Sequence, residues 1–218
     1  MGYFYNQRIL VVPVAGFEED FKRLKDMIDQ CLENEDFSEL EEIMELEYYN
    51  ASIDASEDVF VETTDDYCQF FINADNAGEG FSSDAIGALA HEFNVCVYHA
   101  FSEKDDDHDG AGVGIYFIKS VDEYDEVECG HMFCIIDENR INDGTWYSED
   151  RKGKLPYEPG SEKMETILIR IGHLAWDYGY DYDNDPDYHY ESSCDALKCF
   201  KQILSDLNML TENPKIEL

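Results

Sequence analysis

Residues 82–101 read SSDAIGALAHEFNVCVYHAF, and the expected architecture is built outward from them. The first half predicts a short helix that begins at Ser82 or Ser83, because apolar residues recur at every third or fourth position. The inward positions are Ile86, Leu89, Ala90 and Phe93. Residues 94–101 alternate apolar and polar side chains, which predicts a strand. Residues 113–118 predict its partner strand, across a loop at 102–112.

The same patterns extend this architecture toward both ends of the chain. Further strands are expected at 7–15, 59–63, 67–72, 127–137 and 166–174, and further helices at 17–32, 37–49 and from Ser192 or Ser193 to 210. Ser38 and Glu41 have the spacing of a capping box at the start of the second helix. The sequence therefore predicts an α+β fold, with a mostly antiparallel sheet and helices packed on one face.

Composition divides the chain into three parts. Residues 1–150 are expected to form the α+β main domain. Residues 151–165 are basic and contain two prolines, which is typical of a loop or linker. Residues 166–218 are expected to form a C-terminal strand, an acidic-aromatic loop and a helix, packed on the main domain.

The charge of the chain is extreme and unevenly distributed. Asp and Glu number 51 against 15 Lys and Arg, which gives a net charge of -36. Hydrophobic residues make up 44%, which excludes a disordered acidic tail. Residues 26–103, 120–139 and 171–197 contain no Lys or Arg, so their carboxylates have no compensating cation nearby in sequence. Adaptation to high salt is an alternative origin of such acidity, but the chain has more Lys than Arg.

Three acidic segments are the candidate partner-binding sites. In the run at 177–191, carboxylates alternate with Tyr or Asn, and an extended chain would space them about 6.6–6.8 Å apart on one side. That spacing is close to the phosphate spacing along a nucleic-acid strand. The second segment is an acidic loop between two strands, and the third is the outer face of helix 37–49. The candidates are Asp177, Asp181, Asp183, Asp185, Asp187 and Glu191; Asp105, Asp106, Asp107 and Asp109; and Glu41, Glu42 and Glu45.

In its net charge, its long segments without Lys or Arg and its acidic-aromatic run, the chain resembles the acidic DNA-mimic proteins of phages and mobile elements. That group includes anti-restriction and anti-CRISPR inhibitors. The resemblance implies a cytoplasmic inhibitor, acting in the host cell if phage-encoded, that occludes the basic nucleic-acid-binding surface of a CRISPR–Cas or restriction nuclease. Such a protein would bind neither nucleic acid nor membranes. An immunity protein that neutralises a basic nuclease toxin is an alternative, because it would also bind a basic surface through its carboxylates. Residues 81–118 also resemble part of a ferredoxin-like domain.

Other chemistry has weaker support in the sequence, so neither catalytic residues nor a cofactor or metal are expected. Residues 105–110 match half of a calcium loop, but the twelfth position is Tyr116 rather than a bidentate Glu. Cys129, His131 and Cys134 lack the paired spacing of a zinc site. The seven cysteines form no CxxC pair and predict reduced, buried thiols. A calcium-binding or hydrolytic enzyme remains the alternative from another class.

Overall fold

The computed structural model describes residues 4–46, 53, 59–74, 81–104, 109–122, 126–137, 145–148, 152–154, 156–157, 161–176 and 193–209. The strands are β1 (Phe4–Val12), β2 (Val59–Thr63), β3 (Cys68–Ala74), β4 (Cys96–Lys104), β5 (Asp109–Val121), β6 (Val127–Asp137), β7 (Thr145–Ser148) and β8 (Lys152–Lys154). The helices are α1 (Glu18–Asn34), α2 (Ser38–Ile43), α3 (Ser83–Glu92), α4 (Glu162–Trp176) and α5 (Ser193–Asp206).

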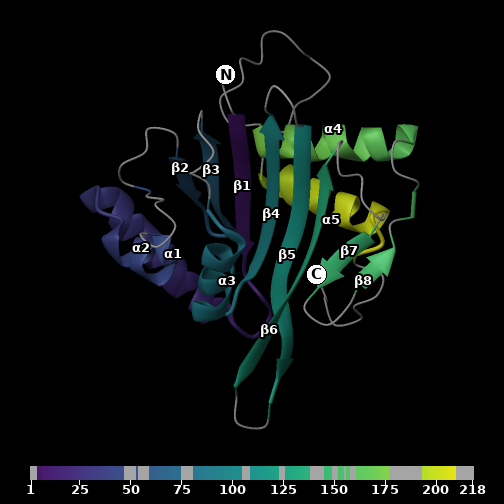
Figure 1. The fold of residues 1–218 in the computed structure, drawn as a ribbon. Coiled ribbons are helices and arrows are strands. Elements are labelled where there is room, and N and C mark those ends of the chain that lie inside the picture. Colours follow the sequence, from purple (N-terminus) through teal and green to yellow (C-terminus); the bar gives the residue numbers. More distant parts are fainter. Residues whose placement is uncertain are drawn as a thin grey trace.

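The eight strands form one sheet in the order β2-β3-β1-β4-β5-β6-β7-β8 (Figure 1). Every neighbouring pair is antiparallel. The hairpin of β2 and β3 is confirmed, as is the pairing of β4 with β5. The α+β fold with an antiparallel sheet is therefore confirmed, and the described residues of 81–118 form α3 and the paired strands β4 and β5.

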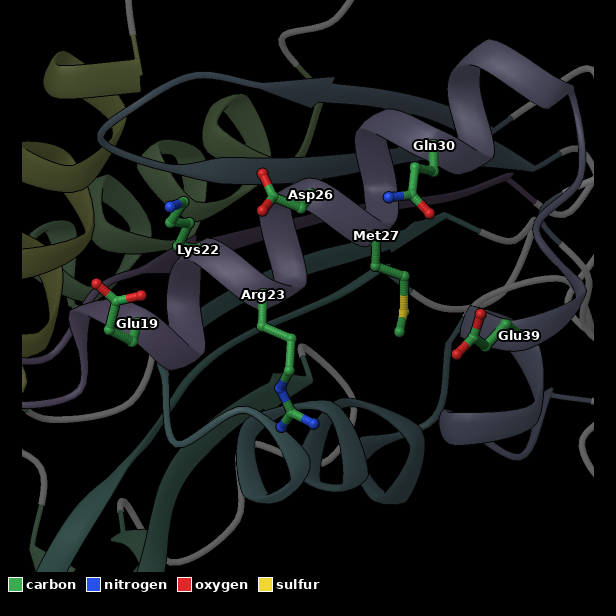
Figure 2. Close-up of a pocket in the computed structure, with 7 residues that line it drawn as sticks. All are labelled: Glu19, Lys22, Arg23, Asp26, Met27, Gln30 and Glu39. Carbon is green, nitrogen blue, oxygen red and sulfur yellow. The ribbon is translucent and has the colours of Figure 1, made fainter.

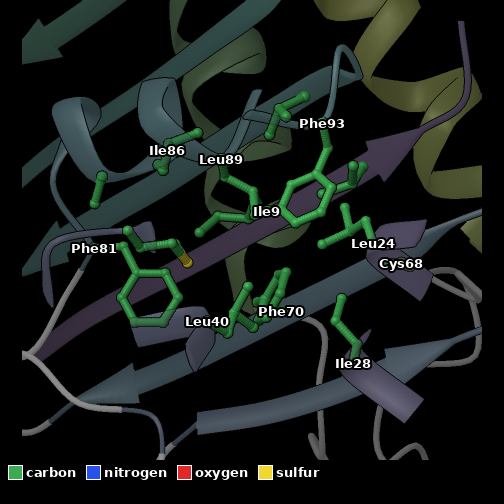
Figure 3. Close-up of a cluster of buried hydrophobic side chains, with 14 of the residues drawn as sticks. Ile9, Leu24, Ile28, Leu40, Cys68, Phe70, Phe81, Ile86, Leu89 and Phe93 are labelled. Atoms are coloured by element: carbon green, nitrogen blue, oxygen red, sulfur yellow. The ribbon is translucent and has the colours of Figure 1, made fainter. Parts of the chain in front are cut away.

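The helices cover both faces of the sheet, not one face as the sequence predicts (Figure 1). Successive residues of a strand point to opposite faces. In β1, Ile9 and Val11 join the core under α1, α2 and α3 (Figure 3), whereas Leu10 joins the core under α4 and α5. The central strands are consequently apolar on both sides, and each side needs its own helical layer.

The strand expected at 166–174 is wrong, because these residues belong to helix α4. The buried positions Met164, Ile167, Ile171 and Leu174 are three or four residues apart, which is the period of a helix. In a strand, Ile169 would lie on the same face as Ile167 and Ile171 and would be buried with them, but it is 56% exposed. The segment 151–165 also contains regular structure, since it includes β8 and the first turn of α4.

Two helix starts show how local chemistry selects a boundary. Ser82 is the N-cap of α3, and its Oγ accepts a hydrogen bond from the Ala85 N–H at 3.1 Å, as its position predicts. At α2 the capping box is wrong: the N-cap is Phe37, and Asp36 accepts hydrogen bonds from the N–H and Oγ of Ser38. The acid two residues upstream thus performs the capping.

A glycine in β5 makes room for an aromatic ring on its neighbouring strand. A Cβ at Gly112 would lie 2.1 Å from Cε1 of Phe101, so the ring would have to leave the strand surface. We expect Gly112→Ala to reduce the free energy of unfolding by about 1–3 kcal/mol, measured by urea denaturation. Gly172→Ala in α4 is the control, because nothing lies within 4 Å of its added Cβ. It should gain about 0.5–1 kcal/mol. Equal stability of the two variants would contradict the packing.

Candidate functional site

Some acidic side chains have partners that hold the fold together. Asp29 of α1 accepts hydrogen bonds from Lys25 Nζ at 2.8 Å and from Thr63 Oγ1 of β2. These bonds, that from Lys25 first, lower the pKa of the Asp29 carboxyl. Asp206 of α5 accepts from Arg170 Nη1 of α4 at 2.7 Å, which joins the two helices on one face of the sheet. Charge at these positions contributes to folding.

A second group of acids has no such role. We call the exposed glutamates around the end of α1 and along α2 the acidic corner, and its members are Glu33, Glu35, Glu39, Glu42 and Glu45. Figure 1 shows α1 and α2 at the side of the molecule where β2 lies, and both contribute to the core on one face of the sheet. Within the described residues, none of the five forms an ion pair with a Lys or Arg. The acidic corner is therefore a negative surface without ion-pair partners among the residues that the structure describes.

The backbone makes this placement unfavourable for the free protein. Glu33 and Glu42 lie in the last turns of α1 and α2, neither of which carries a basic residue there. A negative charge at a helix C-terminus opposes the helix dipole. Glu35 and Glu45 both have φ of 53°, in the left-handed region that favours glycine. The other two non-glycine residues described there are Asn94 and Asn208, a residue type that tolerates this conformation.

The predicted site residues are distributed unevenly over the described structure. Glu42 and Glu45 belong to the acidic corner. Glu41 is half-buried and accepts a hydrogen bond from the backbone N–H of Ile53, so it also supports the fold. Asp109 is the first residue of β5, in register with Lys104. The remaining candidates lie outside the described residues: Asp105, Asp106, Asp107, Asp177, Asp181, Asp183, Asp185, Asp187 and Glu191.

Sequence reasoning missed three members of the acidic corner, namely Glu33, Glu35 and Glu39. For Glu33 and Glu35, the signal that could have found them is the segment 33–36, ENED, which ends an amphipathic helix without a basic residue. Helix ends usually carry Lys, Arg or Gly, so four polar or acidic residues there indicate a charge retained for another purpose.

The acidic run at 177–191 lies outside the described residues, between two helices in the sequence. Helix α4 ends at Trp176 and α5 begins at Ser193. Both helices pack on the same face of the sheet, where Phe200 contacts Tyr98 with ring centroids 5.5 Å apart. The elements that precede and follow the run in the sequence therefore belong to the same helical layer.

A buried polar clamp joins β1 and β4 to the start of α3. Gln7 Oε1 accepts from the Phe81 N–H at 2.8 Å, and Gln7 Nε2 donates to the Phe81 carbonyl at 2.7 Å. This pair of bonds fixes the orientation of the amide. The second N–H of Gln7 then points to His99 Nε2 at 2.6 Å, which must accept. His99 is held as the neutral tautomer with its proton on Nδ1, and desolvation by burial lowers its pKa to about 3.

This clamp predicts an acid-sensitive contribution to stability. The pKa of His99 is lower in the folded protein than in the unfolded chain. The contribution is therefore complete above about pH 6.5, the ordinary pKa of His, and is lost as the pH falls toward 3. Across that range, the uptake of one proton by the unfolded chain lowers the free energy of unfolding by about 1.4 kcal/mol per pH unit. We expect urea denaturation from pH 7 to 4 to show the wild type losing stability faster than His99→Gln, whose amide can accept from Gln7. Parallel curves would contradict the assignment.

Thiol and metal chemistry finds little support in the described structure. Burial raises the pKa of Cys68, Cys96 and Cys134 to about 12, so these thiols stay protonated at neutral pH. His131 stacks on Phe133, with ring centroids 5.7 Å apart, on the face opposite Cys134. Among the described residues, no group of three or more His, Cys, Asp or Glu side chains is placed to hold a metal ion.

Comparisons with known proteins gave no match. No family model, no curated protein and no solved structure matches it. Within the described residues, no helix combines the length and apolar character needed to cross a membrane. The features of the chain that indicate a function are its charge and the placement of that charge in the fold.

Proposed function

We propose that this chain is an acidic inhibitor that binds the basic nucleic-acid-binding surface of another protein and occludes it. Its partner would be the nuclease component of a host defence complex of the CRISPR–Cas or restriction type. Carboxylates of the chain would pair with the Arg and Lys side chains that otherwise hold phosphates. The observation that carries the proposal is the acidic corner, where uncompensated glutamates occupy positions unfavourable to the free protein.

The energetics of the acidic corner support binding to a cationic surface. In the free protein its charges repel one another and oppose two helix dipoles. In a complex, the partner's cations would supply the missing positive charge at those same helix ends. The interaction thus turns an unfavourable feature of the free chain into a favourable feature of the complex.

The amount of charge also matches the proposed partner. Duplex DNA carries one charge per about 1.7 Å of axis, so a net charge of -36 equals that of roughly 60 Å of duplex. Solubility alone needs a net charge of only about 2–8. A rigid domain with this excess can present carboxylates to a channel that is lined for phosphates.

Competition with DNA tests the proposal. The immobilised chain would capture proteins from a cell lysate at low salt, and the captured protein would be eluted with salt and purified. We expect it to bind duplex DNA and to release that DNA when the chain is added. The variant Glu39→Gln/Glu42→Gln should compete less well, and Glu162→Gln/Glu165→Gln in α4 is the charge-matched control. A captured protein that holds DNA and the chain simultaneously would contradict occlusion.

A further inference from the structure

Strand β2 forms one edge of the described sheet, where β3 is its one neighbour among the described strands (Figure 1). In an antiparallel pair, residues whose backbone groups bond to the neighbouring strand alternate with residues whose backbone groups point away from it. The Thr64 N–H donates to the Tyr67 carbonyl at 2.8 Å, which sets the phase of this alternation. Glu62 and Phe60, two and four residues before Thr64, therefore bond to β3. The residues whose N–H and C=O groups point away from the sheet are Val59, Val61 and Thr63.

The side chains of these three outward residues hold the edge in a defined position. Val59 and Val61 are half-buried against the core under α1, α2 and α3. Thr63 Oγ1 donates to the Asp29 carboxylate of α1. Backbone groups that point away from a sheet need water or a further strand as their partner. An ordered strand of this kind is a template on which an extended segment can add.

The two edges of the described sheet differ in charge. At the far edge, β8 has the sequence KGK, and lysine on an edge strand opposes the addition of another strand. β2 has the sequence VFVET, which contains neither Lys nor Pro and has Glu62 as its charged residue. It also lies within the segment 26–103, where the sequence has no Lys or Arg. The β2 edge therefore repels a second copy of this acidic chain and suits a strand that carries positive charge.

The fold supplies little positive charge to this edge. Within the described ion pairs, Lys25 of α1 is the cation that reaches the β2–β3 hairpin. Its Nζ lies 2.8 Å from Asp29 Oδ2 and 3.9 Å from Oδ1 of Asp65, which is in the turn between the two strands. Figure 2 shows Arg23 of the same helix directed toward α3. Two carboxylates thus share Lys25, and the exposed Asp66 adds a further negative charge to the turn.

We propose that an extended, basic segment of the partner adds to the sheet as a strand along β2. The inference rests on the proposed function and names how the partner's chain is held. Main-chain groups of the segment would bond to those of Val59, Val61 and Thr63, and its side chains would alternate between the two faces of the sheet. One set would lie beside Glu62 and Phe60, which is 39% exposed, and a carboxylate next to an aromatic ring suits arginine. The other set would lie beside the two valines and suits apolar residues.

Two peptides of equal charge test this inference on the full chain. The first alternates arginine and valine, and the second is the same peptide with every backbone nitrogen methylated, so it has no N–H to donate. In the free protein at low salt, the amides of Val59, Val61 and Thr63 should exchange fast with D₂O, whereas those of Phe60 and Glu62 should exchange slowly. Saturation with the first peptide should slow exchange of the outward amides about tenfold. Saturation with the methylated peptide should leave their exchange unchanged.

Val61→Pro removes the central outward N–H of β2. Proline is tolerated on an edge strand where the missing N–H would point away from the sheet. The affinity for the arginine–valine peptide should fall about three- to tenfold, the effect of one or two lost hydrogen bonds. The affinity for the methylated peptide is the matched control and should not change. If this variant does not fold, hydrogen exchange in the wild type still decides.

The outcomes separate this inference from the proposed function. If both peptides bind equally and the outward amides still exchange fast, strand addition fails while recognition of cations stands. Slow exchange of the outward amides in the free protein would show that the edge is already covered, which also contradicts the inference. If neither peptide binds at low salt, the proposed function fails as well.

Discussion

Replacing Glu35 and Glu45 together by glycine is expected to stabilise the free protein and to weaken its binding to the basic partner. Both residues have φ of 53°, a conformation that costs a side chain with a Cβ about 1–2 kcal/mol. Glycine removes that strain and a repelling charge, although its flexible unfolded state offsets part of the gain. We expect a net gain of about 1–2 kcal/mol in urea denaturation. Two lost exposed ion pairs should reduce affinity roughly two- to tenfold.

Asn208→Gly is the matched control for this double variant. Asn208 has φ of 61° and follows α5, on the other face of the sheet from the acidic corner. The substitution relaxes a left-handed residue without changing the charge, so affinity should stay at the wild-type value. If the glutamate double variant binds as tightly as the wild type, the acidic corner is not part of the interface. If it loses stability, those two glutamates contribute to folding after all.

Phe200→Ala is expected to cause the largest loss of stability among the single substitutions considered. Phe200 is 0% exposed in the core under α4 and α5, and its ring packs on that of Tyr98. Removing a buried phenylalanine leaves a cavity and typically costs about 3–5 kcal/mol. The substitution should also loosen α5, the helix that follows the acidic run at 177–191 in the sequence. Urea denaturation measures the first effect, and partner affinity below the unfolding transition measures the second.

Lys198→Ala provides the comparison on the same helix. Lys198 is exposed, so its removal should change the free energy of unfolding by no more than about 0.5 kcal/mol. A Phe200→Ala protein that unfolds at the wild-type urea concentration would show that α5 is not anchored by this ring. Unchanged partner affinity in Phe200→Ala would show that partner binding does not depend on the packing of α5.

The elements that could be predicted are those whose apolar period and boundary residues agree. β2 and β6 have the expected bounds, Val59–Thr63 and Val127–Asp137, and α3 begins after its serine cap as expected. The strand predicted at 166–174 is wrong because Ile167, Leu168 and Ile169 form a consecutive apolar run, and such a run is also typical of a buried strand. Including Met164 would have exposed the helical period.

The two-layer arrangement and the acidic corner depend on tertiary structure, so the sequence could show them only in part. The run of Ile9, Leu10 and Val11 is apolar at successive positions, which indicates a strand buried on both faces. The outer position of Glu42 and Glu45 follows from helix periodicity. The left-handed conformation of Glu35 and Glu45 does not, because it depends on where tertiary packing ends each helix.

The salt dependence of partner binding tests the central claim most directly. The affinity of the chain for the captured protein would be measured by titration between about 50 and 300 mM NaCl, a range over which screening between exposed charges becomes strong. If carboxylates replace phosphates on a basic surface, affinity should fall about tenfold or more across this range. An affinity that does not change with salt would show that the negative charge is not what the partner recognises.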